Sequence, residues 1–138
     1  MKMMFVDGQK LKKVKGIMNM IAVTTENKEK TSKVNKCFSN SPWVLYFNID
    51  NNGKIIINKR EPTRDWGKGD KFAKRLLEHN INTVITGELG PGAFKKLNKE
   101  GVKIFRGNNL SAIKSVKKHQ KGLLKRIISP REPGPRRK

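Results

Sequence analysis

Two glycine-rich segments carry residue types that can bind an anion. Thr86–Ala93 reads Thr-Gly-Glu-Leu-Gly-Pro-Gly-Ala, and Trp66–Asp70 reads Trp-Gly-Lys-Gly-Asp; each leads into a predicted helix start. Backbone N–H groups without a partner and the helix dipole both favour negative charge at such places. The first segment is neither a Walker loop, because no Gly-Lys-Ser/Thr follows, nor G-x-G-x-x-G. The alternative is a tight turn that needs glycine only for its backbone angles.

Cys37 is the single cysteine of the chain. One thiol excludes an internal disulfide, a C-x-x-C zinc knuckle and a cysteine-only iron–sulfur site within one chain. A soft thiolate nevertheless suits iron, so Cys37 is a candidate metal ligand. The alternative is a small packed side chain. His79 and His119 fall on predicted helices far apart in sequence, and we interpret both as surface or cap residues.

The apolar pattern predicts the elements that must position these residues. We predict strands at 17–25, 43–49, 54–58, 82–86 and 102–105, with a hairpin turn at Asp50–Gly53. We predict helices that begin near Asp70, Pro91 and Leu110, and loops at 26–36 and 59–68. The order β-β-β-α-β-α-β-α is typical of an α/β domain in which helices pack on one mixed sheet.

Length and charge bound the organisation of the chain. Its 138 residues suit one domain, expected at 17–128, after an N-terminal extension at 1–16 that can form a hairpin. Residues 129–138 hold three prolines and a glycine, so we predict a disordered basic tail. No apolar run is long enough to span a membrane, and the expected location is cytoplasmic.

Positive charge is concentrated near the end of the sequence. The net charge is +21, and residues 114–138 hold ten basic residues and one acid, Glu132. Such a stretch can bind nucleic acid, RNA or DNA, without sequence preference; a membrane surface, an anionic cofactor or simple compositional bias are the alternatives. The candidate nucleic-acid residues are Lys114, Lys117, Lys118, Lys121, Lys125, Arg126, Arg136, Arg137 and Lys138.

Four segments together resemble a known family. They are Ile21–Thr25, Ser32–Pro42, Val84–Phe94 and Gly101–Phe105, and they are similar to the dinitrogenase iron–molybdenum cofactor biosynthesis family, which includes NifX-like proteins, the carboxyl-terminal part of NifB and nitrogenase accessory factors. The resemblance covers roughly Met20 to Lys118, and the I-T-G-x-x-G-P-x-A-F block is its most specific part. It implies a three-layer α/β/α, ribonuclease H-like fold with a mixed sheet of five strands. It also implies a protein that binds or carries an iron–sulfur or iron–molybdenum cofactor precursor without catalysis.

The sequence departs from the family pattern at the segments that would form the site. Cys37 stands where the family has histidine, and Ser39 and Asn40 replace glycine and arginine. Gly92 replaces an asparagine, and the usual G-x-G-A-G is reduced to Gly67-Lys68-Gly69-Asp70. The candidate cofactor-binding residues are Cys37, Ser39, Gly67, Gly69, Thr86, Gly87, Gly90 and Gly92, with Cys37 as the candidate metal ligand.

The sequence therefore suggests three candidate functions. The first is a carrier that exchanges a metal cluster with cluster-assembly or acceptor proteins. The second is nucleic-acid binding by the final helix and tail. The third, a nuclease of ribonuclease H type, needs several carboxylates around two metal ions, and the strands at 17–25 and 83–86 contain no acid. We therefore expect no enzymatic activity; the sequence leaves the oligomeric state open.

Overall fold

The computed structural model describes residues 20–130 and contains one five-stranded mixed sheet with the strand order β3-β2-β1-β4-β5. β1 pairs antiparallel with β2 and parallel with β4, β2 pairs antiparallel with β3, and β4 pairs parallel with β5. The strands are β1 (Met20–Thr25), β2 (Trp43–Ile49), β3 (Ile55–Pro62), β4 (Thr83–Thr86) and β5 (Lys103–Arg106). The helices are α1 (Asp70–Leu77), α2 (Pro91–Lys99) and α3 (Ala112–Gln120), with a short 3-10 turn at Phe38–Asn40.

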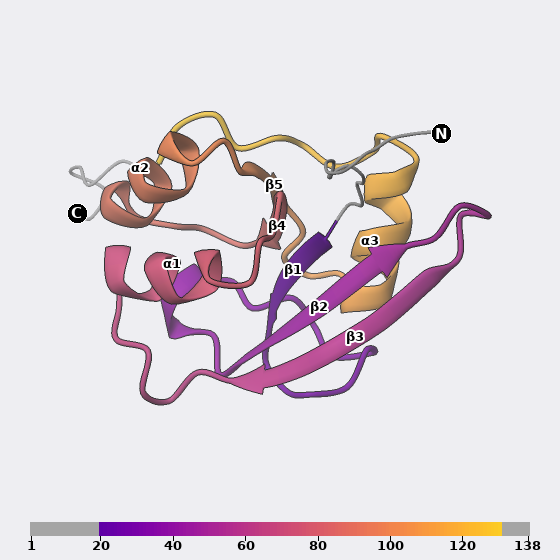
Figure 1. Cartoon of the computed structure of the whole chain (residues 1–138), viewed down its shortest axis with the longest axis horizontal. Helices are drawn as coiled ribbons and strands as arrows, with labels where there is room; N and C mark the ends of the chain where they lie inside the picture. Colours follow the sequence, from indigo (N-terminus) through magenta and orange to yellow (C-terminus); the bar gives the residue numbers. More distant parts are fainter. Residues whose placement is uncertain (1–19, 131–138) are drawn as a thin grey trace, which may run out of the picture.

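The sheet separates two helical layers (Figure 1). On one face, Ala22, Tyr46 and Val84 pack with residues of α1 and α2, such as Leu76 and Leu97. On the other face, the strand residues that alternate with these pack in a second core, which includes Ala112 and Val116 of α3. Alternate residues of a strand point to opposite faces, so a strand that is buried on both faces, such as β1, contributes to both cores. The expected three-layer α/β/α fold with a five-strand mixed sheet is confirmed.

The predicted order of elements is observed within residues 20–130. β2 has the predicted bounds, and α2 begins at Pro91 as predicted. Ser111 caps α3 by accepting a hydrogen bond from the backbone N–H of Lys114 at 3.3 Å. One prediction was wrong: β3 continues to Pro62, whereas residues 59–62 were expected to belong to a loop. β3 is an edge strand, and its Lys59 and Arg60 are exposed to solvent while their backbone pairs with β2. Polar side chains at a sheet edge hide a strand from a search for apolar periodicity.

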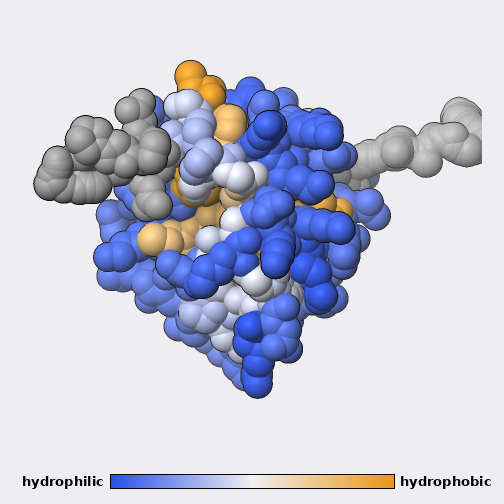
Figure 2. Space-filling view, turned by 90° about the vertical axis from the view of Figure 1, so that its left-hand side faces the viewer, coloured by the Kyte–Doolittle hydropathy of each residue, from blue (hydrophilic) through white to orange (hydrophobic). Residues whose placement is uncertain are grey.

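Parts of the predicted organisation lie outside the described residues: the extension at 1–16, the first residues of the strand predicted at 17–25, and the tail from 131 to 138. Between residues 20 and 130, no helix has both the length and the apolar character needed to cross a membrane. The side on which α1 and α2 lie, turned to the viewer in Figure 2, is mostly hydrophilic.

Candidate functional site

Cys37 lies beside the glycine-rich segment that follows β4. The backbone N–H of Glu88 donates to the Lys36 carbonyl at 2.7 Å, and that of Phe38 donates to the Glu88 carbonyl at 2.8 Å, which forms a parallel bridge between Cys37 and Glu88. The structure therefore brings together two of the segments named from the sequence. Cys37 is a free, half-buried cysteine.

Gly87 makes this close approach possible. A β-carbon at Gly87 would lie 2.2 Å from the Lys36 carbonyl oxygen, so only glycine fits here. Thr86 is fully buried, and its Oγ1 lies 2.6 Å from Oγ1 of Thr24 on the parallel neighbour β1. Gly87 and Thr86 were both named as candidate cofactor-binding residues, and both are buried in the structure: Gly87 lies against the backbone of Lys36, and the Thr86 hydroxyl pairs with that of Thr24.

The N-termini of α1 and α2 meet at Gly92 and Asp70. A β-carbon at Gly92 would lie 3.7 Å from the backbone nitrogen of Asp70. Gly69 and Gly90 are the N-cap residues of the two helices, and neither cap has a side-chain hydrogen bond. Two positive helix ends side by side favour an anion. Asp70 already supplies a carboxylate in the first turn of α1, however, so part of this field is neutralised by the chain itself.

A pocket beside the helix ends, the Ser39–Lys68 pocket, has no such carboxylate. It has a volume of about 210 Å³ and lies between the turn after Cys37 and the loop before α1. Its lining residues are Ser39, Asn40, Ser41, Pro42, Thr63, Arg64, Gly67 and Lys68. None of these side chains is acidic, and two are cationic. Of the predicted site residues, Ser39 and Gly67 line this pocket, while Cys37, Gly69, Thr86, Gly87, Gly90 and Gly92 do not.

Hydrogen bonds fix the two walls of the Ser39–Lys68 pocket. Ser41 Oγ donates to the Cys37 carbonyl at 2.7 Å, and Thr63 Oγ1 donates to the Ser41 carbonyl at 2.6 Å. Lys68 Nζ donates to Oδ1 of Asn40 across the pocket. Ser41 is fully buried and Thr63 nearly so. These bonds tie the loop that carries Arg64 and Lys68 to the segment that carries Cys37.

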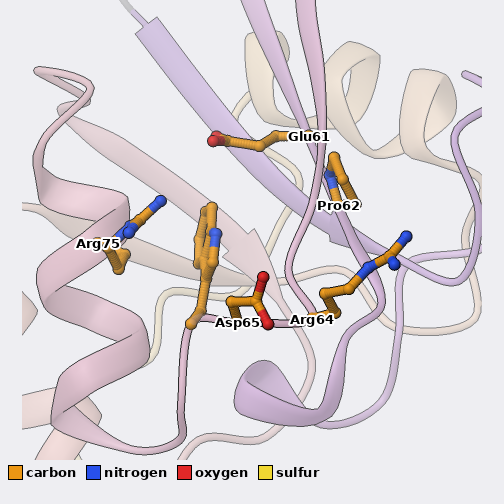
Figure 3. Close-up of a pocket in the computed structure, with 6 residues that line it drawn as sticks. Glu61, Pro62, Arg64, Asp65 and Arg75 are labelled. Atoms are coloured by element: carbon orange, nitrogen blue, oxygen red, sulfur yellow. The ribbon is translucent and has the colours of Figure 1, made fainter.

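A second pocket, the Glu61–Arg75 pocket, has mixed charge (Figure 3). It has a volume of about 310 Å³ and is lined by Glu61, Pro62, Arg64, Asp65, Trp66 and Arg75. Arg64 and Arg75 lie on opposite sides of it, and the Glu61 side chain points toward α1 (Figure 3). The Arg75 guanidinium lies 5.6 Å from the centre of the Trp66 ring. Two carboxylates and two guanidinium groups leave this pocket with no net preference for an anion.

Glu61 also belongs to a hydrogen-bonded group behind that pocket. Its Oε1 accepts from the Tyr46 hydroxyl at 3.0 Å and lies 2.9 Å from Nε2 of His79. Burial, and then the charge of Glu61 and this hydrogen bond, raise the pKa of Tyr46 far above its ordinary value of 10. This group ties β2, β3 and the end of α1 together.

The side chains of residues 20–130 contain no group of three or more His, Cys, Asp and Glu that can hold a metal ion. Cys37 therefore supplies one thiol that belongs to no such group. What the described residues offer a cluster is charge and hydrogen bonding in the Ser39–Lys68 pocket.

The sequence reasoning missed Asn40, Thr63, Arg64 and Lys68 as site residues. Asn40 and Lys68 occur in segments that were compared with the family pattern, but nothing in the sequence placed them opposite each other. They meet because Trp43 of β2 pairs with Pro62 of β3, which brings residues 39–42 and 63–68 together. A sequence prediction that extended this strand to Pro62 would have revealed the pairing.

The comparisons with known proteins agree with this fold. The family model described as "Dinitrogenase iron-molybdenum cofactor" matches residues 18–122. No curated protein gives a significant match.

Solved structures share the architecture at low identity. The apo form of the orange protein from Desulfovibrio gigas is similar with a TM-score of 0.69 and 21% identity, over 86% of this chain and 100% of that one. A NifB candidate protein from Thermotoga has a TM-score of 0.64 and 20% identity, over 85% of this chain and 100% of that one. A dinitrogenase candidate from Methanocaldococcus jannaschii has a TM-score of 0.63 and 18% identity, over 83% of this chain and 100% of that one. At these identities the likeness shows the fold.

Proposed function

We propose that this chain, which belongs to the dinitrogenase iron–molybdenum cofactor family, binds an anionic iron–sulfur or iron–molybdenum cofactor precursor and transfers it to other proteins without catalysing a reaction. The observation that carries the proposal is the Ser39–Lys68 pocket, which has two cationic side chains and no carboxylate in its lining. The family description supports the nature of the cargo.

Charge decides between the two pockets as the place of binding. Both pockets contain Arg64, but the larger one also contains Glu61 and Asp65. In the Ser39–Lys68 pocket, Arg64 and Lys68 attract an anion, and hydrogen bonds to a charged group are about twice as strong as neutral ones. The excess positive charge of the whole chain adds a long-range attraction for a negative cargo.

Cys37 is proposed as the one covalent contact of the protein with the cluster. It directly precedes the turn that carries Ser39, and its carbonyl accepts a hydrogen bond from Ser41, a residue that lines the pocket. One thiolate bond plus charge attraction is a weaker hold than four thiolates. A weak hold suits a carrier that must release its cargo to cluster-assembly or acceptor proteins.

The proposal assigns no chemical step to the domain. Nuclease chemistry on a ribonuclease H-like sheet requires clustered carboxylates for metal binding, whereas the corresponding ends of β1 and β4 carry Thr24, Thr25 and Thr86, all buried. A shared fold does not by itself transfer an activity.

Anaerobic titration with a preformed iron–sulfur or iron–molybdenum cluster tests the proposal, with bound metal measured after desalting. The variants are Cys37→Ala and the double variant Arg64→Gln/Lys68→Gln. The matched control is Lys74→Gln/Lys95→Gln, which removes two exposed charges from α1 and α2. We expect uptake by the native protein and the control, and reduced uptake by both site variants. No uptake by native protein removes the proposal, and equal uptake by Cys37→Ala removes only the role of the thiol.

A further inference from the structure

α3 presents a row of lysines to solvent. Lys114, Lys117, Lys118 and Lys121 follow one another at i, i+3, i+4 and i+7, which places them on one face of the helix and its cap. All four are exposed, whereas Ala112 and Val116 on the opposite face are fully buried. We call these four residues the lysine stripe.

The elements beside α3 extend this positive surface. The chain after α3 returns to the outer edge of β5: Arg106 N–H donates to the Lys125 carbonyl at 2.9 Å, and Ile127 N–H donates to the Ile104 carbonyl at 2.8 Å. The ring of Phe105 lies 4.7 Å from that of His119 on α3. Of the exposed basic residues here, Lys103 and Arg126 lie on the same side of the sheet as Phe105 and α3, because Lys103 alternates with Ile104 and Arg126 pairs with Phe105.

The segment that supplies this surface contains no acidic residue; the acids of neighbouring segments lie toward the two ends of α3, Glu29 in the loop that bonds to Ile113 and Asp50 in the turn that bonds to Gln120. Residues 101–130 contain eight basic residues and no aspartate or glutamate. The ion pairs found within the described part of the chain are Arg75–Glu78 and His79–Glu61, both elsewhere in the fold. The positive charge also affects a neighbouring histidine: burial lowers the pKa of His119, and the charge of Lys103 lowers it further. Repulsion of this kind is relieved when an anion binds.

We propose that the lysine stripe, with Lys103 and Arg126 beside it, binds the phosphate backbone of nucleic acid. From Lys114 to Lys121 the helix rises about 10 Å, and one strand of B-DNA presents a phosphate about every 3.4 Å along its axis. The stripe therefore spans about three phosphate-to-phosphate steps, so its four lysines can face about four successive phosphates. Lysine ammonium groups contact phosphates without reading bases, so the binding is independent of sequence.

The aromatic residues support backbone rather than base recognition. Tyr46 and Trp66 are 1% and 4% exposed, so neither ring can stack on a base. An anionic membrane is the less favoured partner. The apolar face of α3 is buried in the core, and a helix that lies on a bilayer needs that face free.

The proposed surface is separate from the Ser39–Lys68 pocket. α3 lies on the face of the sheet opposite α1 and α2 (Figure 1). Its last residue, Gln120, donates from Nε2 to the Gly53 carbonyl at 2.9 Å, at the turn between β2 and β3. The pocket is built at the other end of that hairpin, where Trp43 pairs with Pro62. The two proposals can therefore fail independently.

Candidate residues Arg136, Arg137 and Lys138 lie outside the described residues, so the experiment uses the full chain and changes the lysine stripe alone. Four Lys→Gln substitutions at 114, 117, 118 and 121 are compared with Lys→Gln at 28, 59, 74 and 95. The latter four are also exposed. Each set reduces the net charge from +21 to +17, because four positive charges are removed from 21. Circular dichroism checks that both variants fold.

Fluorescence anisotropy with mixed-sequence duplex DNA and single-stranded RNA, over a series of KCl concentrations, gives the result. For duplex DNA, log K falls with log salt by about 0.9 per phosphate contact. We expect the stripe variant to lose about tenfold or more in affinity at low salt and about 3 units of this slope, with the control close to native. Equal losses in the two variants, no binding by native protein, or stripe-dependent binding to anionic vesicles but not to nucleic acid would each overturn the proposal.

Discussion

Gly87 is the residue whose replacement the fold tolerates least. In a Gly87→Ala variant the new β-carbon would lie 2.2 Å from a backbone oxygen of Lys36, so the bridge between Cys37 and Glu88 must open. We expect a loss of about 3 kcal/mol or more in the free energy of unfolding, measured with urea. Gly90→Ala is the control, because nothing lies within 4 Å of its β-carbon and its φ is −79°. The control should lose under about 1 kcal/mol; similar losses in the two variants would contradict this account.

The hydrogen bond between Thr24 and Thr86 is the second feature at this scale. Both side chains are fully buried and their hydroxyl oxygens lie 2.6 Å apart. Either single change to valine should cost about 1–3 kcal/mol, because the remaining hydroxyl loses its partner away from water. The double variant should cost less than the sum of the two single changes, as a double-mutant cycle measures. Additive losses would show that the two hydroxyls are not coupled.

His119 reports on the basic surface around it. Burial and then the charge of Lys103 lower its pKa below 6.5. For such a group the contribution to stability is present above the unfolded value and is lost as the pH falls through the folded pKa. In an NMR titration, Lys103→Gln should raise the pKa of His119, and Lys74→Gln on α1 should leave it unchanged. A pKa unaffected by Lys103→Gln would place that ammonium group away from the ring.

Among the elements, the β2–β3 hairpin is the part of the sheet that contributes to both pockets, because both are built at the end where Trp43 pairs with Pro62. Its outer strand was only partly predicted, since the apolar residues at Ile55–Ile57 mark its beginning, while the charged residues from Lys59 onward resemble a loop. A register shift between Tyr46 and Phe47 also breaks the alternation that would reveal the strand. By contrast, β2 and α2 have clear boundaries in the sequence. An apolar run marks β2, and α2 lies between Pro91 at its start and Gly101 just after its end.

The group formed by Tyr46, Glu61 and His79 holds this hairpin against the end of α1, and it should make the stability of the fold depend on pH. Because the pKa of Tyr46 is raised, its contribution to stability is complete below pH 10, the unfolded value, and is lost as the pH rises above it. Tyr46 is the only tyrosine in the chain, so tyrosinate absorbance reports on it alone.

The expected result is that the folded protein shows no tyrosinate absorbance until it unfolds, whereas in concentrated urea the absorbance appears near pH 10. In Tyr46→Phe, the difference in unfolding free energy from the native protein should shrink above pH 10. Ionisation of Tyr46 near pH 10 in the folded state would show that the hydroxyl is not held as described.

In the whole molecule, the fold was predictable because its main features are local: five apolar runs, two helix starts marked by glycine, and a motif shared with a family. The candidate site was only partly predictable. Cys37, Ser39, Gly67 and the glycines after β4 could be named from the sequence, but Arg64 and Lys68 reach the Ser39–Lys68 pocket through the pairing of β2 with β3. Which residues face one another across a pocket depends on that long-range pairing, which no local pattern contains.

Within residues 20–130, the Ser39–Lys68 pocket and the lysine stripe are two separate positively charged regions: the pocket lies at the Trp43–Pro62 end of the β2–β3 hairpin, and the stripe lies on α3 near the turn at the other end. The measurement that distinguishes them is amide NMR under anaerobic conditions, with a paramagnetic iron–sulfur cluster added in steps. This account predicts that signals of residues 37–42 and 63–69 broaden first, while those of α3 remain sharp. Broadening that begins at α3, or that spreads evenly over the surface, would contradict the claim that the pocket holds the cluster.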